Sequence, residues 1–404
     1  AVFTPSNNTQ FTMFKKIITW ACLLGASVLT VTPAYATRSI SFDTGYVVHP
    51  YSNRAFSSFG VELFEAHDYL FGLVKNKYFE PNGWNRGLLF GADLLILYPL
   101  SSAYTISYHE FGHYSRLEAV GHDPHFVGRP NHFFGFFLDK LVHAPFGGES
   151  TAYPALPALT NDEKIVVGGA GVNNEMRFAG DIADRAYYDY GHVMDFVPYI
   201  SGKLSSASYA SGDEPGNDMN FVLNAYKAQE YNVSRADINR ANWLSLVLSA
   251  STYAYAFGIY DYYTEGETTV KTFEFEGWRL PDLESYINRK GVSYKLKSAY
   301  RWDETLILPF SYEVILHGKE QHEVTLGARK LWKEFHNLTT GANLIMSDGI
   351  GGNMYVNYPV LKDWAVTVGL DHYDHKSLHG ERNSIATTRS TSSTEVWAKV
   401  SFLY

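Results

Sequence analysis

The residues best suited to chemistry are His109-Glu110-Phe111-Gly112-His113. On an α-helix, residues i and i+4 share a face, so the imidazoles of His109 and His113 can bind one metal ion. Glu110 lies beside them and can act as general base on a water molecule whose pKa a zinc ion lowers. The spacing predicts a Zn²⁺ site with both histidines as ligands and Glu110 as the catalytic residue. The alternative is a pair of buried, hydrogen-bonded histidines.

A third ligand must come from elsewhere in the chain. Cys22 is the only cysteine and lies in the N-terminal segment, which leaves His, Asp and Glu as candidates. We expect Glu175, because a helical wheel places it in an apolar stripe, where an unpaired carboxylate is costly. The residues that share this stripe are Phe178, Ala179, Ile182 and Ala186. The alternative is a glutamate that only complements a helix dipole.

Four further residues are candidates for supporting roles. His122 follows the motif closely and is a candidate second-shell or substrate-binding group. Asp181 is a candidate to orient a ligand histidine, as second-shell carboxylates often do. His132 and His143 lie in an aromatic-rich loop and are candidates to stabilise negative charge in a transition state.

The motif in the form His-Glu-Phe-Gly-His resembles that of the zincin metallopeptidases and of site-2-type membrane proteases. The resemblance covers the motif and its helix. It implies a peptidase acting on a protein or peptide, with a glutamate third ligand in the gluzincin branch. Ala119 stands where metzincins have a third histidine. A site-2-like intramembrane protease would use 87–108 and 241–260 as spans, and an aspartate as third ligand.

Helical patterns dominate from about residue 60 to 263. The apolar range 87–108 contains Pro99, which predicts a kink, and runs into the motif. We expect a loop over 124–160 with aromatic anchors, and a helix over 174–188 preceded by the glycine-rich run 168–171. A capping box at Ser234 predicts a further helix, whose uncharged later part is 241–260.

Strand patterns replace helical ones from about residue 267. Apolar alternation covers 364–370 and the last ten residues, and further strands are expected near 292–301, 305–316, 322–332, 338–347 and 353–360. We therefore predict an α+β fold, with a helical zincin-like part followed by an antiparallel part. Strands of this length resemble outer-membrane β-barrels, and a soluble sheet is the alternative. The competing interpretation of the whole chain is a non-enzymatic outer-membrane β-barrel protein.

The N-terminal segment has the plan of a secretory signal peptide. Met13 is followed by Lys15 and Lys16, an apolar run over 17–31, and Ala34-Tyr35-Ala36. Residues 1–12 are interpreted as an upstream extension. The predicted organisation is therefore 1–36 extension and signal, 37–265 helical metal-binding domain, and 266–404 antiparallel β domain. Export places the protein in the periplasm or outer membrane of a Gram-negative-type cell.

Charge and composition limit the classes of partner that the protein is expected to bind. Removing Lys15 and Lys16 from 33 basic residues leaves 31 against 42 acidic ones, a net charge of −11. This argues against nucleic acid as a partner, since that needs a basic surface. Aromatic residues make up 16% of the chain, with 30 tyrosines, which suits a membrane interface. We expect membrane association, and the sequence leaves the oligomeric state open.

Overall fold

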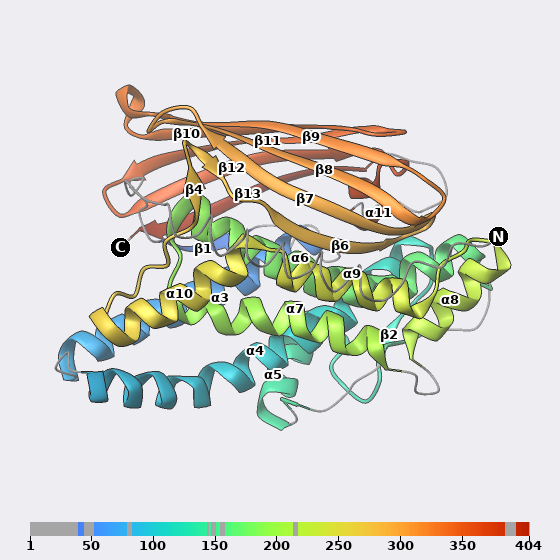
Figure 1. Cartoon of the computed structure of the whole chain (residues 1–404), viewed down its shortest axis with the longest axis horizontal. Coiled ribbons are helices and arrows are strands. Elements are labelled where there is room, and N and C mark those ends of the chain that lie inside the picture. Colours follow the sequence, from blue (N-terminus) through green and yellow to red (C-terminus); the bar gives the residue numbers. More distant parts are fainter. Residues whose placement is uncertain are drawn as a thin grey trace, which may run out of the picture.

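The computed structural model describes residues 39–43, 52–78, 83–143, 145–146, 151–153, 158–212, 217–383 and 393–403. The predicted signal peptide and upstream extension lie outside these residues. The described chain is α+β: Figure 1 shows one curved sheet above a layer of helices. The helix α6 lies under the sheet, and α4 lies on the side of the helical layer away from it.

All described helices except the short η3 (Lys333–Phe335) and α11 (Leu378–Asn383) come early in the chain, after one short strand. They are α3 (Asn53–Tyr78), α4 (Gly83–Ala119), α5 (Phe133–His143), α6 (Asn161–Arg185), α7 (Phe196–Ser211), α8 (Asp218–Ala228), α9 (Arg235–Val247) and α10 (Ala250–Glu265), with the short η1 (Ala186–Tyr190) and η2 (Val193–Asp195) between α6 and α7. A short hairpin of β2 (His125–Phe126) and β3 (Thr151–Ala152) flanks α5.

The predicted motif helix is present as α4, which continues through Pro99. The expected loop over 124–160 is partly wrong, because it contains α5. Three phenylalanines explain this helix, since Phe133, Phe136 and Phe137 are all buried at helical spacing. The uncharged range 241–260 is also divided between two helices, α9 and α10.

The sequence suggested that the glycine-rich run 168–171 precedes a helix, but the run lies inside α6. The helix begins at a capping box of Thr160 and Glu163. Each glycine faces a different neighbour at close range. A Cβ on Gly168 would lie 2.8 Å from Val222 of α8, and one on Gly169 would lie 2.7 Å from Ile287. Glycine is tolerated here despite its low helix propensity because three elements approach α6 closely.

The sheet contains eleven strands. They are β1 (Ser39–Asp43), β4 (Glu274–Phe275), β5 (Trp278–Arg279), β6 (Asp282–Asn288), β7 (Gly291–Arg301), β8 (Leu306–Gly318), β9 (His322–Trp332), β10 (Leu338–Met346), β11 (Ile350–Leu361), β12 (Trp364–Tyr373) and β13 (Ser393–Leu403). The order is β1-β13-β12-β11-β10-β9-β8-β7-β5-β4, with β6 also paired to β7. All described pairs are antiparallel, and the two ends of this path are not paired to each other.

The strands β7 to β13 confirm the seven strands expected from alternation. The other four strands of the sheet, β1, β4, β5 and β6, were not expected. β6 is almost entirely buried, so it shows no alternation in its burial. β1 lies in the part of the sequence assigned to the helical domain, but it pairs with β13.

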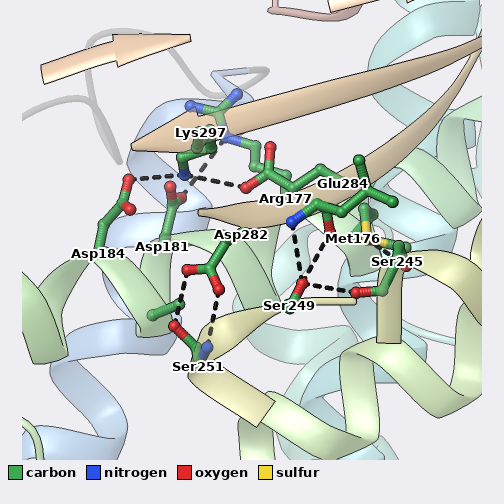
Figure 2. Close-up of polar contacts among 12 residues, drawn as sticks. Met176, Arg177, Asp181, Asp184, Ser245, Ser249, Ser251, Asp282, Glu284 and Lys297 are labelled. Atoms are coloured by element: carbon green, nitrogen blue, oxygen red, sulfur yellow. Dashed lines mark hydrogen bonds and ion pairs between the residues drawn. The ribbon is translucent and has the colours of Figure 1, made fainter. Parts of the chain in front are cut away.

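Charged side chains join the inner face of the sheet to the helices. Figure 2 shows Lys297 of β7 between Asp184 of α6 and Glu284 of β6. Its ammonium nitrogen lies 2.7 Å from the first carboxylate and 2.9 Å from the second. At the other end of the sheet, Arg54 of α3 pairs with Asp43 of β1. The contact between layers is therefore polar, while the main apolar core lies among the helices.

Candidate metal centre

The two histidines of the motif lie where α4 and α6 touch. A Cβ on Gly112 would come within 2.6 Å of the Ala170 carbonyl oxygen, and one on Gly171 within 2.4 Å of the His109 Nε2 atom. Because both positions are glycine, α4 and α6 can pack closely enough for the two imidazoles to contact α6. The rings of His109 and His113 have centroids 4.9 Å apart. The i, i+4 prediction that they share one face is therefore confirmed.

Each imidazole is oriented through its Nδ1 atom. His109 Nδ1 lies 2.9 Å from the Glu175 Oε1 atom. His113 Nδ1 lies 2.7 Å from the Val167 carbonyl oxygen, which can only accept a hydrogen bond. The proton of His113 therefore sits on Nδ1, and in the neutral ring the Nε2 lone pair is free to bind a cation.

Asp218 faces both Nε2 atoms. Its Oδ2 atom lies 3.1 Å from His113 Nε2 and 3.8 Å from His109 Nε2. The three donor atoms all lie within 4.8 Å of one another. His113 Nε2 is buried and makes no hydrogen bond within the described part of the chain, Asp218 included. A lone pair and a carboxylate oxygen at this distance repel each other unless a cation or a proton lies between them.

Asp218 is positioned by the start of α8. It is the first residue of that helix, after the N-cap Asn217, whose side chain accepts from Met219 N–H. The Tyr209 hydroxyl donates to Asp218 Oδ2 over 2.6 Å. Burial raises the pKa of the Asp218 carboxyl, but its interactions with His113 and His109 outweigh burial and lower the pKa well below the usual range. Asp218 is therefore a carboxylate at neutral pH.

Tyr209 contacts both Asp218 and His109. Its ring meets the His109 ring edge to face, with centroids 4.8 Å apart. Burial and the adjacent Asp218 carboxylate raise the pKa of the Tyr209 hydroxyl, which stays protonated. It can therefore donate to Asp218 throughout the physiological range.

Glu110 lies next to the histidines and is buried. Thr151 of β3 donates its hydroxyl to Glu110 Oε2 over 2.8 Å and also contacts the Glu110 carbonyl oxygen. The short hairpin therefore holds the carboxylate that the sequence predicts as general base. Glu110 is not part of the group of three donors, as expected for a base that does not bind the metal.

Glu175 does not belong to this group of donors, contrary to the expectation that it is the third ligand. Its Oε1 atom bonds to His109 Nδ1 and accepts from Ser205 over 2.7 Å, and Oε2 accepts from Ser206 over 3.1 Å. The reasoning that a buried carboxylate needs a partner is sound, but the partners are an imidazole and two hydroxyls. The third residue whose donor atom lies near both histidines is Asp218.

The other predicted residues lie outside this group. His122 is buried against the ring of Tyr153, with centroids 5.1 Å apart. Asp181 accepts from Ser57 and faces α3, so it orients neither histidine of the motif. His132 and His143 lie at opposite ends of α5. His132 caps the helix by accepting from Gly135 N–H, and His143 pairs with Asp139 on the surface.

The donor set fits a zinc ion. Two ligand atoms bound about 2.0 to 2.1 Å from a tetrahedral zinc lie roughly 3.3 Å apart. The observed separations of 3.1 and 3.8 Å lie on either side of this value. Both imidazoles also have the outward Nδ1 partner that zinc-binding histidines almost always have. Asp218 is the most exposed of the three residues, so a metal ion or a substrate would enter the site from its side.

No family model matches the chain, and no curated protein or solved structure matches it. Among the described helices, α4 alone is long and apolar enough to cross a membrane by length and composition.

Proposed function

We propose that the protein is a zinc-dependent hydrolase, most specifically a peptidase, with His109, His113 and Asp218 as ligands and Glu110 as general base. One observation carries the proposal. The Nδ1 atoms of both histidines are bonded to groups outside the set of three donors. Their Nε2 atoms and one Asp218 oxygen face one another, and His113 Nε2 makes no hydrogen bond within the described residues. A cation relieves the resulting repulsion, and the zincin-like motif indicates which cation.

The protein groups have separate tasks. When bound, zinc would lower the pKa of a water molecule and polarise a substrate carbonyl. Glu110 accepts a proton and passes it to the leaving amine. Thr151 keeps this carboxylate in place, and Glu175 and Val167 hold the two imidazoles in the tautomer that leaves Nε2 free. A peptide bond is the substrate that the motif resemblance suggests.

An intramembrane peptidase is a second candidate. Two observations favour it: the third donor is an aspartate, as the site-2-type resemblance implies, and the motif lies at the end of the apolar helix α4. The two candidates differ in substrate. The first cleaves a soluble fluorogenic peptide, whereas the second cleaves only a peptide that spans a micelle or bilayer.

Metal content tests the proposal first. We would measure zinc by mass spectrometry in the purified wild type and in His113→Ala, Asp218→Ala and Glu175→Gln. The wild type should hold one zinc, the first two variants none, and Glu175→Gln should bind zinc more weakly. The matched control is His143→Ala, which removes an exposed histidine. A folded wild type that takes up no zinc on titration would refute the proposal and favour a non-enzymatic protein.

A further inference from the structure

The outward face of the sheet is apolar across five neighbouring strands. In the middle of β9 to β13, the outward side chains include Leu326, Leu344, Met354, Val368 and Val396, with exposed fractions of 49–60%. The strands' register makes these side chains neighbours, since Leu326 pairs with Leu344, and Met354 and Val396 both pair with Leu370. We call these five residues the outward apolar face.

The inner face of the same strands is charged. Glu323, Asp371 and Glu395 are buried there. The guanidinium of Arg54 lies 2.6 Å from the Glu395 carboxylate and 3.5 Å from Asp371. In a soluble α+β protein the apolar face of a sheet packs against the helices. Here the polarity is reversed, as in sheets whose outer side faces lipid.

The charge pattern along the strands matches a bilayer. Among the outward residues of β9 to β13 in the described chain, Lys330 alone is a lysine, arginine, aspartate or glutamate, and it lies near the end of β9. Trp332, Trp364 and Phe402 lie at that same end of the sheet. Aromatic side chains at the rim of an uncharged band are typical of the membrane interface.

The length of the strands fits the thickness of the apolar part of a bilayer. β12 contains ten residues, so it is about 33 Å long at roughly 3.3 Å per residue. A tilt of about 40° reduces this to roughly 25 Å, the height of the apolar band of membrane-spanning sheets.

A bilayer also requires that no sheet edge leave its backbone groups unpaired. Helix side chains pair some of these backbone groups on β6 and on β1. On β6, Ser249 donates to the Leu283 carbonyl and accepts from Leu283 N–H, and Asn173 bonds to both backbone groups of Ile287. Figure 2 shows Ser249 in this position. On β1, Ser41 N–H donates to Glu62 of α3 over 2.7 Å.

The helical layer has an apolar surface of its own. Leu88, Leu95, Ile96 and Tyr98 of α4 are 53–80% exposed, and α4 lies away from the sheet (Figure 1). Asp93, the charge within this stretch, is buried and lies 2.9 Å from His67. A protein partner docked on the sheet would leave this surface in water, whereas a bilayer surrounds both.

We propose that the outward apolar face and the exposed side of α4 contact the hydrocarbon of a lipid bilayer, with helix side chains pairing backbone groups on β6 and β1. The protein is then a mixed membrane structure in which strands form one wall and helices the other. This inference does not depend on the metal centre.

Spin labelling tests the inference in the full chain. On a Cys22→Ala background, which removes the only cysteine, single cysteines at Leu326, Val368 and His372 would carry a nitroxide in phosphatidylcholine vesicles. Labels at 326 and 368 should collide with oxygen more than with a nickel chelate, and the label at 372, at the end of β12, should do the reverse. Free collision of the first two with the chelate, or protection from both reagents by a second copy, would overturn the inference.

Charge substitution gives an independent measurement. In vesicles, Val368→Arg should lower the folded-to-unfolded ratio about 30-fold to 1,000-fold, while His372→Arg at the strand end should change it by less than about fivefold. Equal, small effects of both substitutions would show that Val368 faces water and would overturn the inference.

Discussion

Replacing Gly171 by alanine should disrupt the metal centre through one methyl group. The new Cβ would lie 2.4 Å from Nε2 of His109 and 2.5 Å from two ring carbons. Ordinary contact begins at 3.4 Å, so the ring must move by about 1 Å. The Glu175 bond and the Tyr209 ring restrict that movement.

The magnitude follows from the tolerance of zinc bonds. Ligand distances vary by only about 0.2 Å, so a movement of about 1 Å removes His109 as a ligand. Disturbing an outer-shell partner already costs roughly 10-fold to 100-fold in affinity. We therefore expect Gly171→Ala to bind zinc at least about 100-fold more weakly. Overpacking costs about 1 to 3 kcal/mol and alanine regains about 1 kcal/mol of helix propensity, so the metal-free protein should lose up to roughly 2 kcal/mol.

The assay is zinc affinity by competition with a chromophoric chelator, together with thermal unfolding of the metal-free protein. The control is Gly72→Ala in α3, where a Cβ meets no atom within 4 Å. The control should bind zinc like the wild type. If folded Gly171→Ala binds zinc as tightly as the wild type, His109 is not a ligand in the position described, and the reasoning fails.

Two other substitutions test separate parts of the structure. Glu110→Gln should keep its zinc and lose about 10²-fold to 10⁴-fold in peptide hydrolysis rate, as expected for a general base; loss of zinc would instead make Glu110 a ligand. Tyr209→Phe removes the hydroxyl that donates to Asp218 and should weaken zinc binding about 10-fold to 100-fold, measured by chelator competition.

Periodic patterns and local motifs predicted much of this structure. The i, i+4 spacing of His109 and His113 specifies one helical face, and that relation is local. The strands β7 to β13 have one face toward charged helices and one face outward, so their sequences alternate visibly. β6 is buried on both faces and carries no such pattern.

The third donor could not be found in this way. Asp218 follows Asn217 at the start of a helix, where Asn and Asp are common as caps. Its role depends on how α8 packs against α6, which involves residues far apart in the sequence. Gly168, which allows this packing, lies in a glycine-rich run that resembles a loop when considered alone. Glu175 was singled out correctly as a buried carboxylate, but burial does not reveal which partner neutralises it.

The pairing of β1 with β13 has a consequence for how the chain reaches this form. Residues 39–43 are synthesised long before residues 393–403, yet they share a ladder of hydrogen bonds. Contacts of such long sequence separation slow folding, because the loop must close before they form. A chain that ended before β13 would leave the edges of β1 and β12 open to other chains. The sheet can therefore be completed only after β13 has been synthesised, and holding the earlier strands unfolded until then favours correct assembly.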